Sequence, residues 1–277
     1  MSTETAVADH YTTGELFERV RGGLRAVGVD PARATVADLK AADEFHTGGV
    51  AATDHLMAQL EFTPGQRVLD VGSGIGGTSR YLADRHGAQV TGIDLTPEFV
   101  ETARSLSAMV GMGDATTFQV GSALDMPVQD ATFDLAVLMH VGMNVADKAK
   151  LMTEIARALA PGGRLALFEV MAGASDVPLA FPLPWSTTPD TSFVAPPAAY
   201  RDGAAAAGLT LDVETDRTEF ALDFFAMVFA KVAADGPAPL GIHLMMGETA
   251  PLKFQNYVAN LKAGNIRPVE MIFTKGG

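Results

Sequence analysis

The chain has 277 residues, enough for one large domain or for one domain with a substantial appendage. Apolar residues make up 48% and charged residues 19%, the balance of a globular protein with ample material for a core. The net charge of −13 disfavours a nucleic-acid partner, the lack of cysteine excludes disulfides and thiolate catalysis, and no apolar run is long enough to span a bilayer.

The first 60 residues are expected to be mostly helical, with helical patterns over 14–28, 35–43 and 48–60. The first twenty residues lack the basic and apolar regions of a signal peptide, so we expect a cytoplasmic protein. Short strand patterns then alternate with longer helical ones. The expected strands are 67–71, 89–94, 116–120, 135–140 and 164–170, and the expected helices are 78–86, 97–110 and 146–159. This alternation predicts an α/β protein with a doubly wound parallel sheet.

The regular alternation stops after Val170. Residues 171–197 form a proline-rich stretch that is too long for an idle connection in a compact domain. The later elements expected are a helix at 197–207, a strand at 209–216, a helical stretch to residue 233, a helix at 248–265 and a strand at 267–275. Earlier in the chain, "LAPGGR" at 159–164 is expected to end the helix at 146–159 before the strand at 164–170 begins.

A glycine-rich turn, "VGSGIGG", falls where the first strand should give way to a helix. Glycine lets the backbone approach a ligand closely, and the helix that follows offers unpaired N–H groups. The second strand ends in Asp94, about twenty residues further on, where a carboxylate can accept hydrogen bonds from a ribose diol. Dinucleotide sites share both features, so the turn and Asp94 alone leave the ligand open.

Four motifs in order resemble those of class I S-adenosylmethionine (SAM)-dependent methyltransferases. They are "VLDVGSGIGG", "VTGIDLTPEFVETAR", "ALDMPVQDATFDLAVLMHV" and "KLMTEIARALAPGGRLAL", and together they extend from about Phe62 to Val170. The resemblance implies a Rossmann-like, doubly wound seven-stranded sheet whose last strand is antiparallel. It also implies three parts: an N-terminal helical segment over the cofactor (1–60), a SAM-binding core (61–172), and a substrate lid with the last core strands (173–277).

The same resemblance implies which residues hold SAM and its product S-adenosylhomocysteine. Asp70 would hold the turn or the ammonium group, and the backbone of Gly72, Ser73 and Gly74 would pass the methionine moiety. Asp94 would take the ribose hydroxyls and Leu95 would pack on the adenine. Ser122 stands where the family often has an acidic residue, and Ala123 and Leu124 would flank the adenine ring.

The segment before the core, "DEFHTGGVAATDHLMAQL", is similar to that of phosphoethanolamine and sarcosine/dimethylglycine N-methyltransferases. This similarity implies that Thr47 and Gly48 open a helix beside the SAM carboxylate. The alternative is an ordinary helix with Thr47 as its N-cap. Tyr11 is a further candidate for a contact with SAM, because N-terminal segments of the family often fold over the cofactor.

Several side chains are candidates for the acceptor side of the site. His140 and His46 are the candidate general bases, and His140 is also expected near the sulfonium methyl. Asn144 and Glu169 lie near strand ends that should face the pocket, and Glu169 could pair with a cationic substrate or cap the lid. Phe181, Trp185 and His243 belong to the lid. The aromatic lid residues could instead only pack the lid onto the core. No His, Asp or Glu group has the spacing of metal ligands, so no metal is expected.

The sequence therefore predicts a methyltransferase that moves a methyl group from SAM to a small molecule, first of all to an amine nitrogen. The alternatives are O- or C-methylation of a natural-product scaffold, a catalytically silent SAM-binding subunit and, less favoured, an NAD-dependent oxidoreductase. We expect no nucleic-acid or membrane partner, and a homodimer stays open.

Overall fold

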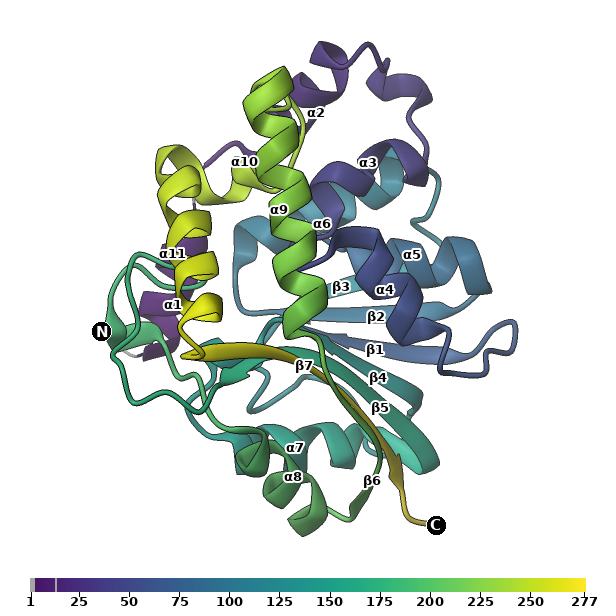
Figure 1. The fold of residues 1–277 in the computed structure, drawn as a ribbon. Coiled ribbons are helices and arrows are strands. Elements are labelled where there is room, and N and C mark those ends of the chain that lie inside the picture. Colours follow the sequence, from purple (N-terminus) through teal and green to yellow (C-terminus); the bar gives the residue numbers. More distant parts are fainter. Residues whose placement is uncertain (1–2, 13) are drawn as a thin grey trace.

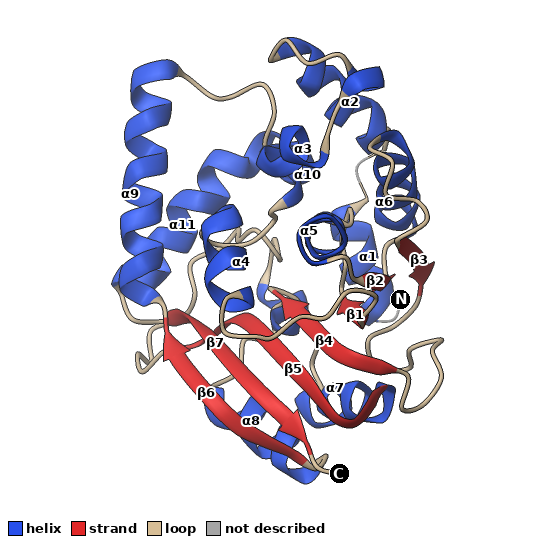
Figure 2. Ribbon diagram, turned by 90° about the vertical axis from the view of Figure 1, so that its right-hand side faces the viewer, coloured by secondary structure: helices blue, strands red, loops and turns tan. Residues whose placement is uncertain are grey.

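The computed structural model describes residues 3–12 and 14–277. At its centre lies a seven-stranded sheet in the order β3-β2-β1-β4-β5-β7-β6 (Figures 1 and 2). The strands are β1 (Arg67–Val71), β2 (Gln89–Asp94), β3 (Thr116–Val120), β4 (Phe133–Met139), β5 (Leu159–Ala172), β6 (Leu209–Asp216) and β7 (Ile266–Lys275). Only β7 runs antiparallel, since it pairs in that sense with both β5 and β6. The expected α/β sheet with an antiparallel last strand is thereby confirmed.

Helices cover both faces of the sheet, with α7 and α8 on one face and α4 and α5 on the other (Figure 2). The helices are α1 (Thr3–Tyr11), α2 (Leu16–Ala26), α3 (Val36–Asp43), α4 (Gly49–Met57), α5 (Gly77–His86), α6 (Pro97–Met109), α7 (Lys148–Ala158), α8 (Pro197–Ala206), α9 (Thr218–Asp235), α10 (His243–Met246) and α11 (Ala250–Lys262). No helix of this described part of the chain is both long enough and apolar enough to cross a bilayer.

The strand side chains alternate between two buried cores, as expected for a sheet covered on both faces. In β4, Leu135 and Val137 pack with α4 and α5. Ala136 and Leu138 pack on the opposite side with α7 and α8. The central strand β4 reads as a nearly continuous apolar run for this reason. The parallel strands β1 to β5 end along a single edge of the sheet.

The expected bounds of β1, β2, β3 and β6 match the structure residue for residue. Helix α7 begins two residues later than expected, because the Asp147 side chain accepts a hydrogen bond from the Lys150 N–H and caps the helix there. The stop expected at 159–164 is wrong in one respect. Strand β5 already begins at Leu159, which pairs with Phe133 across a register shift before the regular ladder resumes at Arg164.

Candidate active site

One cavity of about 880 Å³ opens where the carboxyl ends of β1, β2 and β4 meet. This is the edge at which open α/β sheets bind their ligands. Its lining comes from α1, the α3–α4 connection, the glycine turn, the ends of the strands, the β5–α8 connection at 173–196, here called the lid, and α9 to α11. The predicted site residues that line it are Tyr11, His46, Thr47, Asp70, Gly72, Ser73, Gly74, Asp94, Leu95, Ser122, Ala123, Leu124, His140, Asn144, Trp185 and His243.

The glycine turn after β1 exposes backbone to this cavity. Gly74 has a φ of +53°, and a Cβ placed on it would meet no other atom within 4 Å. Gly72 also has positive φ, and a Cβ there would lie 2.3 Å from a Val141 methyl carbon, so this position has no room for a side chain. Between them, the buried hydroxyl of Ser73 has no hydrogen-bond partner in the protein. An unpaired buried hydroxyl in a cavity wall is a group that a bound ligand can satisfy.

Asp94 closes the opposite side of the turn at the end of β2. Its carboxylate accepts hydrogen bonds from the Gly74 N–H at 2.8 Å and the Thr96 N–H at 2.8 Å. Burial raises the pKa of Asp94, while the backbone N–H groups of Thr96 and Gly74 oppose this rise by stabilising the charged form. The two N–H bonds fix the carboxylate at the cavity wall and leave further oxygen lone pairs available as acceptors.

Asp70, the acidic residue that precedes the glycines, lies under the turn. It accepts a 2.6 Å hydrogen bond from the Ser79 hydroxyl on α5. Burial raises its pKa to about 6, against the stabilising bond from Ser79. This bond ties the end of β1 to the first turn of α5 and thereby fixes the glycine turn between them.

The loop after β3 carries Ser122, Ala123 and Leu124. The Ser122 hydroxyl donates to the carboxylate of Glu4 on α1, and the Leu124 N–H donates back to the Ser122 oxygen. The N-terminal helix α1 thus brings the Glu4 carboxylate to Ser122, the position where related methyltransferases often have an acidic residue. Glu4 lines the cavity, and no local pattern predicts its place there because it lies 118 residues from Ser122 along the chain.

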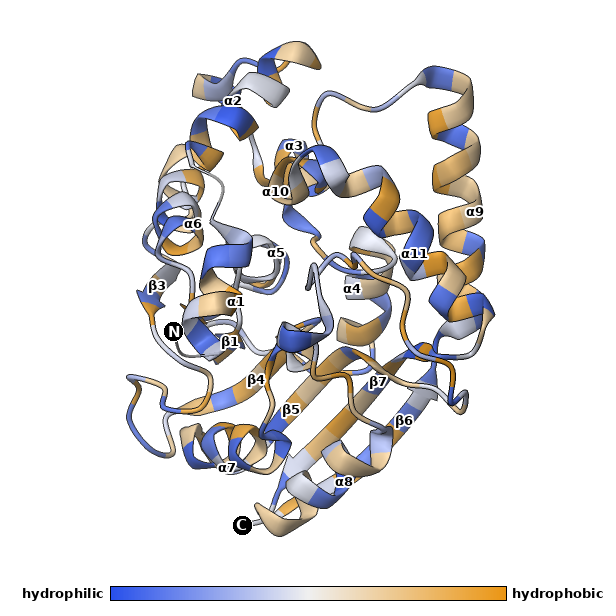
Figure 3. Cartoon of the chain, turned by 90° about the vertical axis from the view of Figure 1, so that its left-hand side faces the viewer, coloured by the Kyte–Doolittle hydropathy of each residue, from blue (hydrophilic) through white to orange (hydrophobic). Residues whose placement is uncertain are grey.

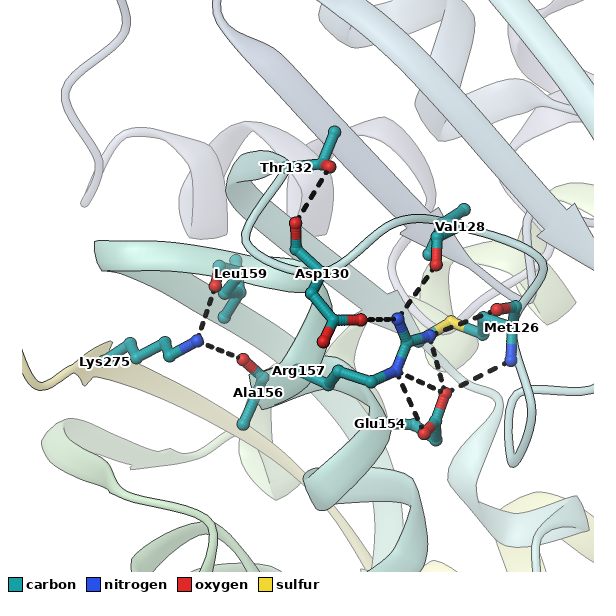
Figure 4. Close-up of polar contacts among 9 residues, drawn as sticks. All are labelled: Met126, Val128, Asp130, Thr132, Glu154, Ala156, Arg157, Leu159 and Lys275. Atoms are coloured by element: carbon teal, nitrogen blue, oxygen red, sulfur yellow. Dashed lines mark hydrogen bonds and ion pairs between the residues drawn. The ribbon is translucent and has the colours of Figure 1, made fainter.

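Arg157 on α7 holds the rest of this loop in place (Figure 4). Its guanidinium donates to the carbonyl groups of Met126 and Val128 and to the carboxylate of Asp130. Glu154, one turn earlier on α7, bonds both the guanidinium and the Met126 N–H. These fixed bonds order the loop on the core and so position its first residues at the cavity.

A chain of hydrogen bonds joins three elements beside the turn. The Tyr257 hydroxyl on α11 lies 2.7 Å from the Thr47 Oγ1, which lies 3.1 Å from the His140 Nε2. The His140 Nδ1 lies 3.0 Å from the carbonyl oxygen of Phe168, which can only accept, so Nδ1 carries the proton and Nε2 is an acceptor. The alternative that Thr47 is the N-cap of α4 is wrong, because the helix begins at Gly49 and its N-cap is Gly48.

His140 has an unusual backbone for a residue with a side chain, with a φ of +57° directly after β4. Non-glycine residues rarely adopt this left-handed conformation, and it occurs often at functional sites. Burial, and next the charge of His46, lower the pKa of His140 to about 3. The imidazole is therefore neutral near pH 7 and is a weak base in this setting.

His46 has a carboxylate partner. Its Nε2 lies 2.9 Å from Glu44, which also accepts a 2.8 Å hydrogen bond from the Thr53 hydroxyl. Burial raises the pKa of Glu44, but the hydrogen bonds and charge of His46 outweigh it with help from Lys40, so that the pKa falls to about 2. The ionised carboxylate orients the imidazole and can stabilise its protonated form. Sequence patterns did not single out Glu44.

Tyr11 and Asn144 join α1 to the lid. The Tyr11 hydroxyl donates to the Asn144 Oδ1 at 2.8 Å, and the Asn144 amide donates to the carbonyl groups of Trp185 and Thr191. The indole of Trp185 is almost fully buried and lies at the cavity wall. One amide side chain therefore holds the N-terminal helix and the lid together over the cavity.

Three predicted site residues lie outside the cavity lining: Gly48, Phe181 and Glu169. Gly48 is the N-cap of α4, and a Cβ on it would meet the Phe220 ring at 2.4 Å. Phe181 packs in the apolar cluster between the lid and α11. Glu169 is fully buried, and its two carboxylate oxygens accept the Val141 and Gly142 N–H groups at 2.8 Å each. Glu169 thereby fixes the backbone that follows His140.

We expect Glu169 to make the stability of the fold depend on pH. Burial raises its pKa to about 8, against the stabilising backbone N–H bonds. A carboxyl group with a raised pKa in the folded state favours folding less and less as pH rises from its unfolded pKa to its folded one. Between pH 5.5 and pH 8, the wild type should therefore lose on the order of 2–3 kcal/mol of unfolding free energy relative to Glu169→Gln, whose side chain does not titrate. Urea unfolding at both pH values measures this, and a constant difference would contradict the assignment.

Within residues 3–12 and 14–277, no group of three or more His, Asp or Glu side chains is arranged to hold a metal ion. The polar groups at the cavity include a bare backbone turn, hydroxyl groups, and several carboxylates and histidines, among them Asp94, Glu44 and His46. This set suits an organic ligand with hydroxyl, amine and carboxylate groups better than a cation held by ligands.

The fold and the position of the site define the class: a Rossmann-like α/β domain of the class I methyltransferase type. Residues 69–167 match the family model described as a methyltransferase domain, so the chain contains a domain of that family. The family resemblance expected from the four motifs is confirmed.

Individual relatives agree with this family. Over 98 residues the chain is 48% identical to a probable tocopherol O-methyltransferase of Oryza sativa, covering 35% of this chain and 27% of the relative. It is 40% identical over 100 residues to ajmaline N-methyltransferase of Rauvolfia serpentina, covering 36% and 34%. The chain thus spans about a third or less of the length of these two curated relatives.

Among solved structures, phosphoethanolamine N-methyltransferase 2 of Haemonchus contortus aligns with a TM-score of 0.74 at 18% identity. The alignment covers all of this chain and 60% of that one. At this identity the likeness shows the fold.

Proposed function

We propose that this protein transfers a methyl group from SAM to a protic nitrogen or oxygen of a small-molecule acceptor. The observation that carries the proposal is the meeting of three groups in one cavity: the bare backbone of Gly74, the unpartnered hydroxyl of Ser73, and the anchored carboxylate of Asp94. The matching methyltransferase domain and its O- and N-methyltransferase relatives support the same reaction.

The residues fit SAM group by group. Asp94 would accept the ribose hydroxyls, Ser73 and the backbone of Gly74 would contact the methionine moiety, and Leu95 and Leu124 would enclose the adenine. Glu4, together with Ser122, would accept hydrogen bonds from the adenine amine. When bound, SAM supplies a methyl group on a positively charged sulfur. The acceptor nucleophile would attack this methyl carbon in line with the C–S bond, and S-adenosylhomocysteine would leave.

The protein's own contribution is alignment and removal of one proton. Alignment of two bound reactants can supply about 7–11 kcal/mol of the barrier. We propose His46 as the general base. In the neutral ring the Nε2–H faces the Glu44 carboxylate, so Nδ1 would take the proton, and the Thr47 carbonyl oxygen, 3.3 Å from Nδ1, would then accept a hydrogen bond from it while Glu44 stabilises the imidazolium. His140 has too low a pKa for this role and instead positions Thr47 through its Nε2.

An amine nitrogen was the first expectation for the acceptor atom, and a hydroxyl oxygen fits the His46–Glu44 pair equally well. Both atoms must lose a proton to give a stable methylated product. The relatives include both O- and N-methyltransferases, in agreement with a base that serves either atom.

Ligand binding followed by methyl transfer tests this proposal. S-adenosylhomocysteine at 100 times its Kd should raise the free energy of unfolding by about 2.7 kcal/mol, whereas NAD at the same concentration should not change it. Transfer of a labelled methyl group from SAM to a pool of phenols and amines should then give labelled product. Stabilisation by NAD but not by S-adenosylhomocysteine would refute the proposed cofactor. Binding without transfer to any acceptor would favour a silent SAM-binding subunit.

A further inference from the structure

Helix α9 is apolar nearly all round and stands at the edge of the molecule with few neighbours (Figures 2 and 3). Of its 18 residues, only Ala221 and Phe225 are fully buried. Five of its side chains line the cavity: Phe224, Phe225, Val228, Phe229 and Val232. A helix that packs against so little protein and still carries a run of apolar side chains presents them to something other than the core.

At Phe225, α9 packs directly on an aromatic cluster formed by α11 and the lid. The Phe225 ring lies 5.9 Å from that of Phe254 and 5.2 Å from that of Tyr257, and Trp185 lies 6.0 Å from Tyr257. The Tyr257 ring belongs to this apolar cluster, while its hydroxyl bonds Thr47 in the polar part of the cavity. Tyr257 therefore marks the boundary between an apolar half and a polar half of one cavity.

The apolar half offers almost no charge to a ligand. Among the lining residues from Phe224 to Tyr257, a span that the structure describes completely, Glu248 is the only Asp, Glu, Lys or Arg, and it is exposed. Burial lowers the pKa of His243, the remaining titratable group apart from Tyr257, which favours its neutral form. A charged acceptor would lose its hydration here without gaining an ionic partner.

We propose that the acceptor is an amphiphile. Its elongated apolar body lies along the turns of α9 that follow Phe225, against Val228, Phe229 and Val232, and its single polar nucleophilic group lies at Thr47 and Tyr257. This inference rests on the proposed methyl transfer and names its substrate class. A small zwitterionic or cationic amine does not match the apolar half, and an alkylated phenol or a long-chain amine in its neutral form does.

A series of 4-n-alkylphenols, from ethyl to octyl, tests the apolar half directly. Trp185 is the only tryptophan of the chain and lies at the cavity wall, so its fluorescence reports binding. Each added methylene should tighten binding roughly threefold to fourfold until the chain fills the cavity. Affinity that does not depend on chain length would overturn the proposal, as would tighter binding of sarcosine or choline than of 4-hexylphenol.

Two neighbouring residues of α9 provide a matched pair of variants. Val228 lines the cavity, whereas Met227 points away from it with 67% of its surface exposed. Val228→Asp should weaken 4-octylphenol binding at least about tenfold by placing a carboxylate in the apolar half, and Met227→Asp should leave it unchanged. Equal effects of the two variants would overturn the assignment. If Val228→Asp does not fold, Val228→Thr and Met227→Thr give the same comparison, with an expected loss of a few-fold for Val228→Thr only.

The two proposals fail separately. The alkylphenol series is measured with and without S-adenosylhomocysteine, and the cofactor titration needs no acceptor. A chain-length dependence without cofactor binding would leave the apolar half intact and refute the methyl transfer. Cofactor binding with a flat alkylphenol series would refute only the amphiphilic acceptor.

Discussion

Replacing Asp94 by alanine is expected to weaken the binding of S-adenosylhomocysteine by at least about 100-fold. The carboxylate would accept two ribose hydroxyls, and a hydrogen bond to a charged group contributes about 1.5–3 kcal/mol. The substitution also removes the partner of the Gly74 and Thr96 N–H groups, which loosens the turn that contacts the rest of the ligand. Isothermal titration calorimetry measures the change.

Two controls separate the ribose contact from general damage. Asp114→Ala changes an exposed aspartate before β3, so the Kd should stay within about twofold of the wild-type value. Asp94→Asn keeps the shape and one acceptor oxygen and should show an intermediate loss. If Asp94→Ala binds S-adenosylhomocysteine within threefold of the wild type, the ribose role is wrong.

The second large effect is expected for His46→Ala, with a fall in kcat of roughly 10²- to 10⁴-fold, the usual range for the loss of a general base. The affinity for S-adenosylhomocysteine should change little, because the proposed role is in proton removal. Glu44→Gln should lower kcat as well, since a neutral amide cannot stabilise the imidazolium. Steady-state kinetics with labelled SAM and a phenol acceptor measures both variants.

A merely structural role of His46 would give a different pattern. Added imidazole should restore part of the activity of His46→Ala, and acceptors with strongly acidic hydroxyls, which are already ionised, should lose much less of it. His86→Ala is the matched control, because His86 stacks on Phe62 and does not line the cavity. A uniform loss for all acceptors without rescue would remove His46 from proton transfer.

The sequence predicts best those features that depend on local chemistry. The expected bounds of β1, β2, β3 and β6 agree with the structure. The glycine turn and Asp94 also lie where they were expected, because positive φ angles and strand ends restrict the residue types directly. The start of α7 was predicted two residues too early, because the position of an N-cap such as Asp147 depends on a single side-chain hydrogen bond.

The acceptor half could not be predicted from patterns, since contacts distant in sequence create it. Tyr257 reaches Thr47 across 210 positions. On the cofactor side the same holds for Glu4, which reaches Ser122 across 118 positions. Helix α9 has no polar face to give a clear amphipathic signal, so its part in the cavity follows only from its place beside α11. Glu169 was expected near the substrate because β5 ends at the right edge, but its side chain turns toward the backbone N–H groups after β4.

The left-handed backbone of His140 has a consequence for how this protein could evolve. The conformation costs a residue with a Cβ about 1–2 kcal/mol relative to glycine, and typical domains are stable by only about 5–15 kcal/mol. The conformation places Val141 over Gly72 and the imidazole beside Thr47. Glycine at position 140 would relieve this strain, but it would also remove the imidazole that bonds the Phe168 carbonyl group and Thr47. Relief of the backbone strain and the proposed positioning of Thr47 therefore oppose each other at this one residue.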